Sequence, residues 1–219
     1  NLQIEGFFNS GIEVSGSYYT FITNSFIKNN AIGLKIDKQS TSVYLTLSEL
    51  RFNSIGIFIT GNSFANFMNN NMIESNIGHF YTEDRSLNQN NINSTGRAIV
   101  IKNAISNIVN NNYFENHAVN ITLDNAQKNI ISNNFIAISD QISTSDKNQV
   151  SLQLIGRSEE NIYEKNSFLT TTEKLNDNKI IVGTEDYSSN KIDVGKDNEK
   201  VKAYLKKNIS LEKNRPVIP

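Results

Sequence analysis

The chain has 219 residues and a net charge of −1, so it lacks the basic surface of a nucleic-acid-binding protein, and we expect no nucleic-acid partner. It contains no cysteine, which excludes disulfide bonds and thiolate metal sites. Asparagine occurs 36 times and proline only twice. This composition favours tightly turning β structure over helices, because asparagine tolerates left-handed turns and weakens helices.

A phrase of about 22 residues returns along the chain, at 24–36, 48–59, 70–81 and 111–123. Within each phrase apolar and polar residues alternate over short runs, which is the periodicity of strands. The apolar anchors, spaced by 23, 22, 22 and 20 residues, are Ile32, Ile55, Ile77, Ile99 and Val119. Three short strands per unit predict a solenoid in which each unit buries its apolar face against its neighbours.

Asparagines recur two residues before a Phe, Met or Tyr, where a corner between strands is expected. They are Asn24, Asn70, Asn111, Asn133 and Asn166. Stacked in register, their amides would hydrogen-bond along the solenoid and satisfy backbone groups of the turns. The sequence therefore predicts an all-β parallel β-helix with asparagine-rich corners.

Two segments, GIEVSGSYYTFITNSFIKNNAIGLKI and AIVIKNAISNIVNNNYFENHAVNITL, resemble the right-handed parallel β-helix of the pectate-lyase superfamily. Residues 42–81 are similar to the β-helices of bacteriophage tailspikes and capsule depolymerases. The resemblance covers 1–168, which we expect to form regular coils. Residues 169–219 are expected to form looser terminal coils and a charged C-terminal cap or tail. The resemblance also implies a homotrimer and a polysaccharide ligand.

The largest early interruption of the phrase, residues 81–96, carries two acids beside an arginine. Glu83 and Asp84 are candidates for a glycosidase acid/base pair, and Arg85 for a clamp on a sugar carboxylate. The alternative is a solvated loop with a surface ion pair.

Glu74 and Glu115 take nearly the same place in their coils, directly after an apolar pair. If 81–96 fills the intervening coil, they lie two coils apart, or roughly 10 Å at the usual strand spacing, near the separation of an inverting glycosidase. Lys28 and Arg51 occupy comparable places in earlier coils. The column is either a catalytic stripe or a charged face that serves solubility.

Candidates for substrate binding are His79, Tyr81, Arg85, Arg97 and Tyr113. A base removing the proton next to a uronate carboxylate, with a cation to neutralise that carboxylate, would make the protein a lyase. The tyrosines are candidates for sugar stacking. His79 has a structural alternative, in which it marks a register shift that lets Phe80 turn inward. The acids are not clustered as in a calcium loop, so we expect neither a metal nor a cofactor.

The leading hypothesis is a phage tailspike-like protein that binds bacterial surface polysaccharide and cleaves it, by hydrolysis rather than elimination. A non-catalytic shaft or adhesin and a secreted polysaccharide lyase are the alternatives. The chain begins inside the repeat and no apolar run could cross a bilayer. We therefore expect part of a longer extracellular or virion protein, without membrane insertion.

Overall fold

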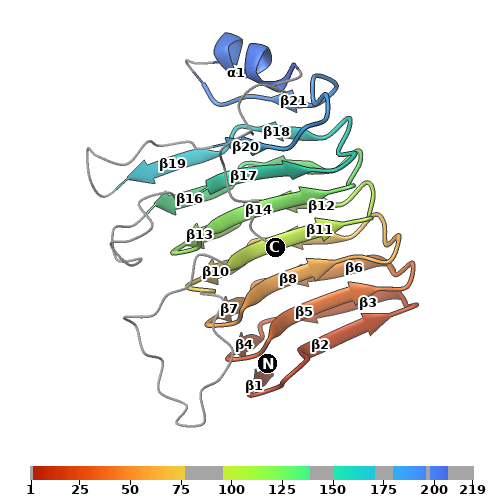
Figure 1. Ribbon diagram of the computed structural model, residues 1–219. Helices are drawn as coiled ribbons and strands as arrows, with labels where there is room; N and C mark the ends of the chain where they lie inside the picture. The colour runs from red at the N-terminus through yellow and green to blue at the C-terminus, as the bar shows by residue number, and fades with distance from the viewer. Residues whose placement is uncertain (1, 77–95, 139–149, 171–179, 196–197, 207–219) are drawn as a thin grey trace.

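Short alternating segments of the chain form strands, and these wind into a right-handed parallel β-helix, as the sequence predicts (Figure 1). The structure is a computed structural model and describes residues 2–76, 96–138, 150–170, 180–195 and 198–206. Each coil gives one strand to each of three parallel sheets of seven strands. We call them sheets A, B and C, and the turns between them the A–B, B–C and C–A corners.

The strands are short and follow one another in strict rotation between the sheets. Sheet A contains β1 (Gln3–Glu5), β4 (Phe26–Lys28), β7 (Glu49–Arg51), β10 (Met72–Glu74), β13 (Tyr113–Glu115), β16 (Phe135–Ile138) and β19 (Ser167–Thr170). Sheet B contains β2 (Ser10–Ser15), β5 (Ile32–Asp37), β8 (Ile55–Ile59), β11 (Arg97–Lys102), β14 (Val119–Asp124), β17 (Val150–Ile155) and β20 (Ile180–Val182). Sheet C contains β3 (Tyr18–Thr23), β6 (Thr41–Thr46), β9 (Phe67–Asn69), β12 (Ile108–Asn110), β15 (Ile130–Ser132), β18 (Ile162–Glu164) and β21 (Lys191–Ile192).

The register confirms the predicted period where the coils are uninterrupted and corrects it where they are not. Ile32 pairs with Ser10 and with Ile55, at separations of 22 and 23 residues. Ile55 then pairs with Arg97, which lies 42 residues further along the chain. The predicted anchor at Ile99 is therefore wrong by two residues, because Ile99 pairs with Ile57. The other predicted anchor in this interval, Ile77, lies outside the described residues. The interval from Ile55 to Arg97 is nearly two periods long, so the spacing alone predicted an additional coil that the sheets do not contain.

The core is a stack of inward-facing side chains, one layer per coil. Sheet A contributes Leu50, Ile73 and Phe114, which pair in register on successive strands and are fully buried. Sheets B and C contribute matching columns of Ile, Leu, Val and Met. Since each layer packs only against the layers beside it, stability is distributed along the whole solenoid.

Two buried core residues, Tyr163 and Tyr187, are polar at their tips. Tyr163 is 1% exposed, and its hydroxyl has no hydrogen-bond partner among the described residues. A buried, unsatisfied hydroxyl costs about 1–3 kcal/mol, so we expect Tyr163→Phe to raise the free energy of unfolding by about 1 kcal/mol in urea titrations. Tyr44→Phe, on the outer face, is the matched control and should change little. A destabilised Tyr163→Phe variant would contradict the prediction.

The corner asparagines divide into two kinds, which corrects one sequence prediction. Asn24, Asn70, Asn111 and Asn133 have φ between 49° and 55° and point out of the corner, so they do not stack. The following residue is buried and stacks instead, as Asn71 does on Asn112 with an Nδ2–Oδ1 distance of 3.0 Å. An asparagine doublet therefore supplies first a left-handed turn residue and then a ladder amide.

Three such ladders run along the three corners. The A–B ladder is Asn30, Asn53, Asn76 and His117. The B–C ladder is Asn66, Asn107, Asn129, Asn161 and Asn190. The C–A ladder is Ser25, Ser48, Asn71, Asn112, Asn134 and Asn166. Of the five asparagines predicted to stack, only Asn166 does.

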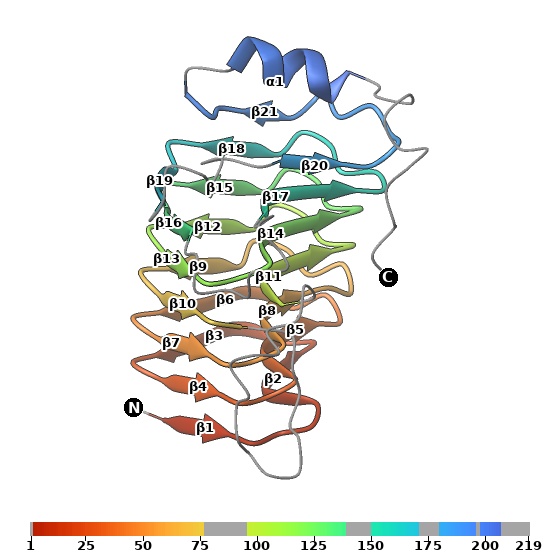
Figure 2. The ribbon, with the colours of Figure 1, turned by 60° about the vertical axis from the view of Figure 1, so that its left-hand side comes forward.

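One end of the solenoid is covered by helix α1 (Asn198–Leu205), which lies over β21 and opposite the end that holds β1 (Figure 2). Leu205 is buried against the last coil, and its carbonyl accepts a hydrogen bond from the Tyr187 amide at 3.0 Å. No helix in the described part of the chain is long and apolar enough to cross a membrane.

Candidate functional site

The outer face of sheet A carries two columns of side chains, because alternate residues of each strand point outward. The first column is Gln3, Phe26, Glu49, Met72, Tyr113 and Phe135. The second is Glu5, Lys28, Arg51, Glu74 and Glu115. The charged stripe expected from the sequence is therefore present, with its residues in register.

Glu74 and Glu115, which we call the acidic pair, are immediate neighbours. Their Cα atoms are partners across β10 and β13, so the predicted separation of two coils is wrong. Adjacent strands lie about 4.8 Å apart, which replaces the predicted 10 Å. The error has the same origin as the misplaced anchor, because β13 is the direct neighbour of β10 in sheet A.

The two carboxylates have different partners. Arg51 donates to Glu74 from Nε at 3.1 Å and from Nη2, and it also contacts Glu49 at 2.6 Å. Burial lowers the pKa of the Arg51 guanidinium, but the hydrogen bond and the charge of Glu74, with the charges of Glu49 and Glu115, leave that pKa above its usual value. Glu74 therefore faces a fixed positive charge, and its side chain is only 19% exposed.

Glu115 instead accepts a hydrogen bond from a neutral phenol. The Tyr113 hydroxyl donates to Glu115 Oε2 at 2.6 Å. Burial, and then this bond to the carboxylate, raises the pKa of Tyr113 to about 12, so the phenol keeps its proton at neutral pH. Tyr113 also stacks on Phe135, with ring centroids 5.5 Å apart, which fixes the ring beside the acidic pair.

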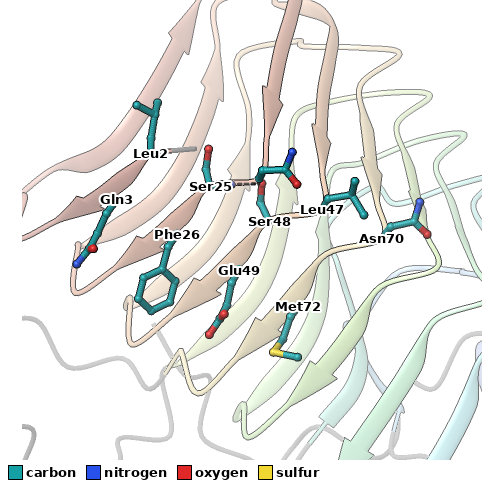
Figure 3. A pocket seen from close by; sticks show the side chains of 10 residues that line it. Leu2, Gln3, Ser25, Phe26, Leu47, Ser48, Glu49, Asn70 and Met72 are labelled. Carbon is teal, nitrogen blue, oxygen red and sulfur yellow. Dashed lines mark hydrogen bonds between the residues drawn. The ribbon is translucent and has the colours of Figure 1, made fainter.

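A shallow groove with a volume of about 750 Å³ runs along the C–A corner next to the first column (Figure 3). Phe26, Glu49 and Met72 line it, each from a successive strand of sheet A. Met72 is 41% exposed, and the Lys28 ammonium lies 5.1 Å from the centre of the Phe26 ring. Glu49 and Met72 share their strands with Arg51 and Glu74, so the groove lies beside the column that contains the acidic pair.

Only some of the predicted site residues come together. Glu74, Glu115 and Tyr113 form one site on sheet A. Arg97 begins β11 on sheet B, paired with Ile55 and Val119, and burial lowers the pKa of its guanidinium. The remaining candidates fall in 77–95, outside the described residues. They are His79, Tyr81, Glu83, Asp84 and Arg85.

Sequence reasoning missed two features of this face. Arg51 was recognised only as part of a stripe, although it joins Glu49 to Glu74. Phe135 was not singled out, although it begins its strand at the position of Tyr113 one coil later. Both would have followed from alignment of the three-residue strands alone, without the corner residues.

Among the described residues, no group of three or more His, Asp or Glu side chains is placed to hold a metal ion. Comparison with known families and proteins found no match: neither a protein-family model nor a curated protein sequence matches the chain. The residues of the site are therefore the basis for assigning a function.

Proposed function

We propose that this protein binds a bacterial surface polysaccharide along the outer face of sheet A and hydrolyses it at the acidic pair, as a tailspike-like protein of a virion or another extracellular particle. The observation that carries the proposal is the pairing of Glu74 and Glu115 on adjacent strands, each with a different partner. The fold and the sequence resemblance to tailspike β-helices support the choice of polysaccharide.

The different surroundings of the two carboxyl groups suggest different roles. Glu74, held in place by Arg51, suits the nucleophile that attacks the anomeric carbon. Glu115 is then the partner left to protonate the glycosidic oxygen as the bond from carbon to oxygen breaks, with Tyr113 holding its carboxyl group in place. The resulting glycosyl ester on Glu74 would be hydrolysed by a water that Glu115 deprotonates. Carboxyl groups on neighbouring strands match the separation of about 5 Å in retaining enzymes.

The groove provides a place for the rest of the chain of sugars. Phe26 and Met72 offer apolar surface, and Gln3 and Glu49 offer hydrogen-bonding groups in the same row (Figure 3). Binding sites for small polar ligands commonly combine these two kinds of lining. A glycan lying in the groove would extend across the strands of sheet A toward the acidic pair.

The second candidate function is a non-catalytic shaft or adhesin, and one observation favours it. The second column of sheet A includes ordinary ion pairs, such as Lys28 with Glu5 at 3.1 Å, and the contact of Arg51 with Glu74 continues this pattern. Such a stripe solubilises an outer face without catalysis. Elimination is a third possibility, which the masses of the products distinguish from hydrolysis.

The test is incubation with a panel of bacterial capsular polysaccharides and lipopolysaccharides, followed by mass spectrometry. Hydrolysis gives shortened repeat units that have gained a water, and elimination gives products lighter by one water. We expect Glu74→Gln and Glu115→Gln each to lower turnover by about 100-fold to 10,000-fold. Glu13→Gln, an ion-paired residue on the outer face of sheet B, is the matched control and should keep full turnover.

Two outcomes would count against the proposal. Full turnover in both glutamine variants would remove the acidic pair from catalysis. Glycan binding by the wild type without any shortened product would favour the adhesin.

A further inference from the structure

The outer face of sheet C carries an apolar column, one residue per coil over six coils. It consists of Phe21, Tyr44, Phe67, Ile108, Ile130 and Ile162, each the register partner of the next. The three aromatic rings stack with centroids 4.8 Å apart and interplanar angles of 6° and 3°. A second row beside it, at the B–C corner, includes Tyr18, Phe64 and Ile105, which are 67%, 40% and 45% exposed.

This face differs in charge from the other two. The neighbouring column on β3 to β15 of sheet C is uncharged and consists of Thr23, Thr46, Asn69, Asn110 and Ser132. Charge returns at the end of the face, where Lys191 on β21 pairs with Glu164 on β18. Sheet A carries the ion pairs described above. Sheet B carries Lys35 with Glu13 and Asp37, and Lys102 with Asp124. Loss of charged residues and enrichment in aromatic ones mark the buried centre of protein interfaces.

The stacked rings do not make a sugar-binding platform. A sugar stacks on the face of an aromatic ring, but Tyr44 has Phe21 against one face and Phe67 against the other. The column therefore presents ring edges and aliphatic side chains, which suit contact with another apolar surface. This separates the sheet C face from the site on sheet A.

We propose that the apolar column is an interaction surface whose occupant is a second copy of this chain. From β3 to β15 this face offers no charge complementarity to a charged partner, so we expect the partner surface to be uncharged there, as this same face is. The side chains of the column are spaced at the strand separation of about 4.8 Å, and the same column on a second copy has the same spacing, so the two can match in register. Ridges and grooves of two such faces can interdigitate along their whole length, with the sheets about 10 Å apart.

The size of the face sets the expected strength. Six strands at a spacing of about 4.8 Å span roughly 24 Å along the axis from first to last, and the two rows are only a few residues wide. Such a contact buries about 1,000 Å² in total, near the lower limit for a specific interface. We therefore expect association with a dissociation constant of about 1–100 μM rather than an obligate oligomer.

The test uses the whole chain in sedimentation velocity across a concentration series from about 1 to 300 μM, chosen to bracket that dissociation constant. Wild-type protein is expected to self-associate, and Ile108→Lys, at the middle of the column, to weaken association at least about tenfold. Val100→Lys, a half-buried outward position on sheet B, is the matched control and should associate as the wild type does. Wild-type protein that stays monomeric throughout would overturn the proposal, as would equal weakening by both variants.

A second measurement exploits the absence of cysteine in the chain. Ile108→Cys should form a disulfide-linked dimer on mild oxidation of protein near its dissociation constant, whereas Val100→Cys should not. Equal crosslinking of the two variants would show random collision and overturn the proposal. The sheet A site is not involved, so Ile108→Lys should bind glycan as the wild type does if the proposed function is correct.

Discussion

Replacing His117 by alanine is expected to lower the free energy of unfolding by about 3 kcal/mol, because it empties a fully buried site and removes two hydrogen bonds. His117 is the last member of the A–B ladder among the described residues, at a place where the preceding coils have asparagine. Its Nε2 accepts a hydrogen bond from the Asn76 side-chain amide at 3.1 Å, and its Nδ1 lies 3.2 Å from Asn120 Oδ1. This pairing requires the neutral ring with its proton on Nδ1.

The same site makes stability depend on pH. Burial lowers the pKa of His117 to about 3, and the bond to Asn120 only partly opposes this. The unfolded chain takes up a proton on this histidine near pH 6.5, while the folded chain does not. The contribution of His117 to the free energy of unfolding is therefore complete above that pH and is lost as the pH falls toward 3. Between about pH 7.5 and pH 4.5 the loss amounts to about 2 to 3 kcal/mol.

His117→Asn is the control that separates the two effects. The asparagine can accept the Asn76 amide as in the preceding coils, so we expect stability within about 1 kcal/mol of the wild type at neutral pH. The variant should lack the histidine part of the pH dependence, measured as the difference between urea titrations at the two pH values. An equal pH dependence in both proteins would show that His117 is not the group responsible.

The second large effect is expected at the centre of the C–A ladder. Asn112 is 2% exposed, and its side chain takes part in five hydrogen bonds, with Asn71, Met68, Asn110 and Asn134. Asn112→Ala leaves the Asn71 amide and the Met68 carbonyl short of hydrogen-bond partners in a buried corner. We expect it to lower the free energy of unfolding by about 3 kcal/mol or more.

The neighbouring asparagine supplies the matched comparison. Asn111 is exposed and has a φ of 55°, which glycine adopts freely. Asn111→Gly should therefore stay within about 0.5 kcal/mol of the wild type in the same urea titration. If the two variants lower the free energy of unfolding by the same amount, the division of the doublet into a turn residue and a ladder residue would be wrong.

Much of the fold could be predicted because short, local sequence patterns define the repeat. Three-residue strands with one apolar centre, such as Met72–Glu74, and the asparagines at the corners identify the β-helix without long-range information. The division of labour within Asn111 and Asn112 could not be predicted, since it depends on which of two adjacent side chains faces inward at a corner. The inward-facing residue is determined by which of the two has a left-handed backbone conformation. Asparagine permits this conformation, but its presence in the sequence does not predict it.

The candidate site was predicted less well, and the reason is register. The position of Glu74 on the outer face followed from alternation alone, but its neighbour depends on how many residues lie between β10 and the next strand of sheet A. The interval of 41 residues between Glu74 and Glu115 is close to twice the period, so spacing could not distinguish one coil with an insertion from two coils. The partners of the pair, Arg51 and Tyr113, follow once that register is known.

The three long intervals in the chain, 77–95, 139–149 and 171–179, all fall between a strand of sheet A and a strand of sheet B. The B–C ladder continues across all three intervals, and the C–A ladder continues across the first two, as Asn66 to Asn107 and Asn134 to Asn166 show. A change in the length of such an interval leaves every ladder partner at those corners in place. Evolution can therefore vary one edge of the molecule by insertion and deletion while the remaining two edges act as a fixed frame.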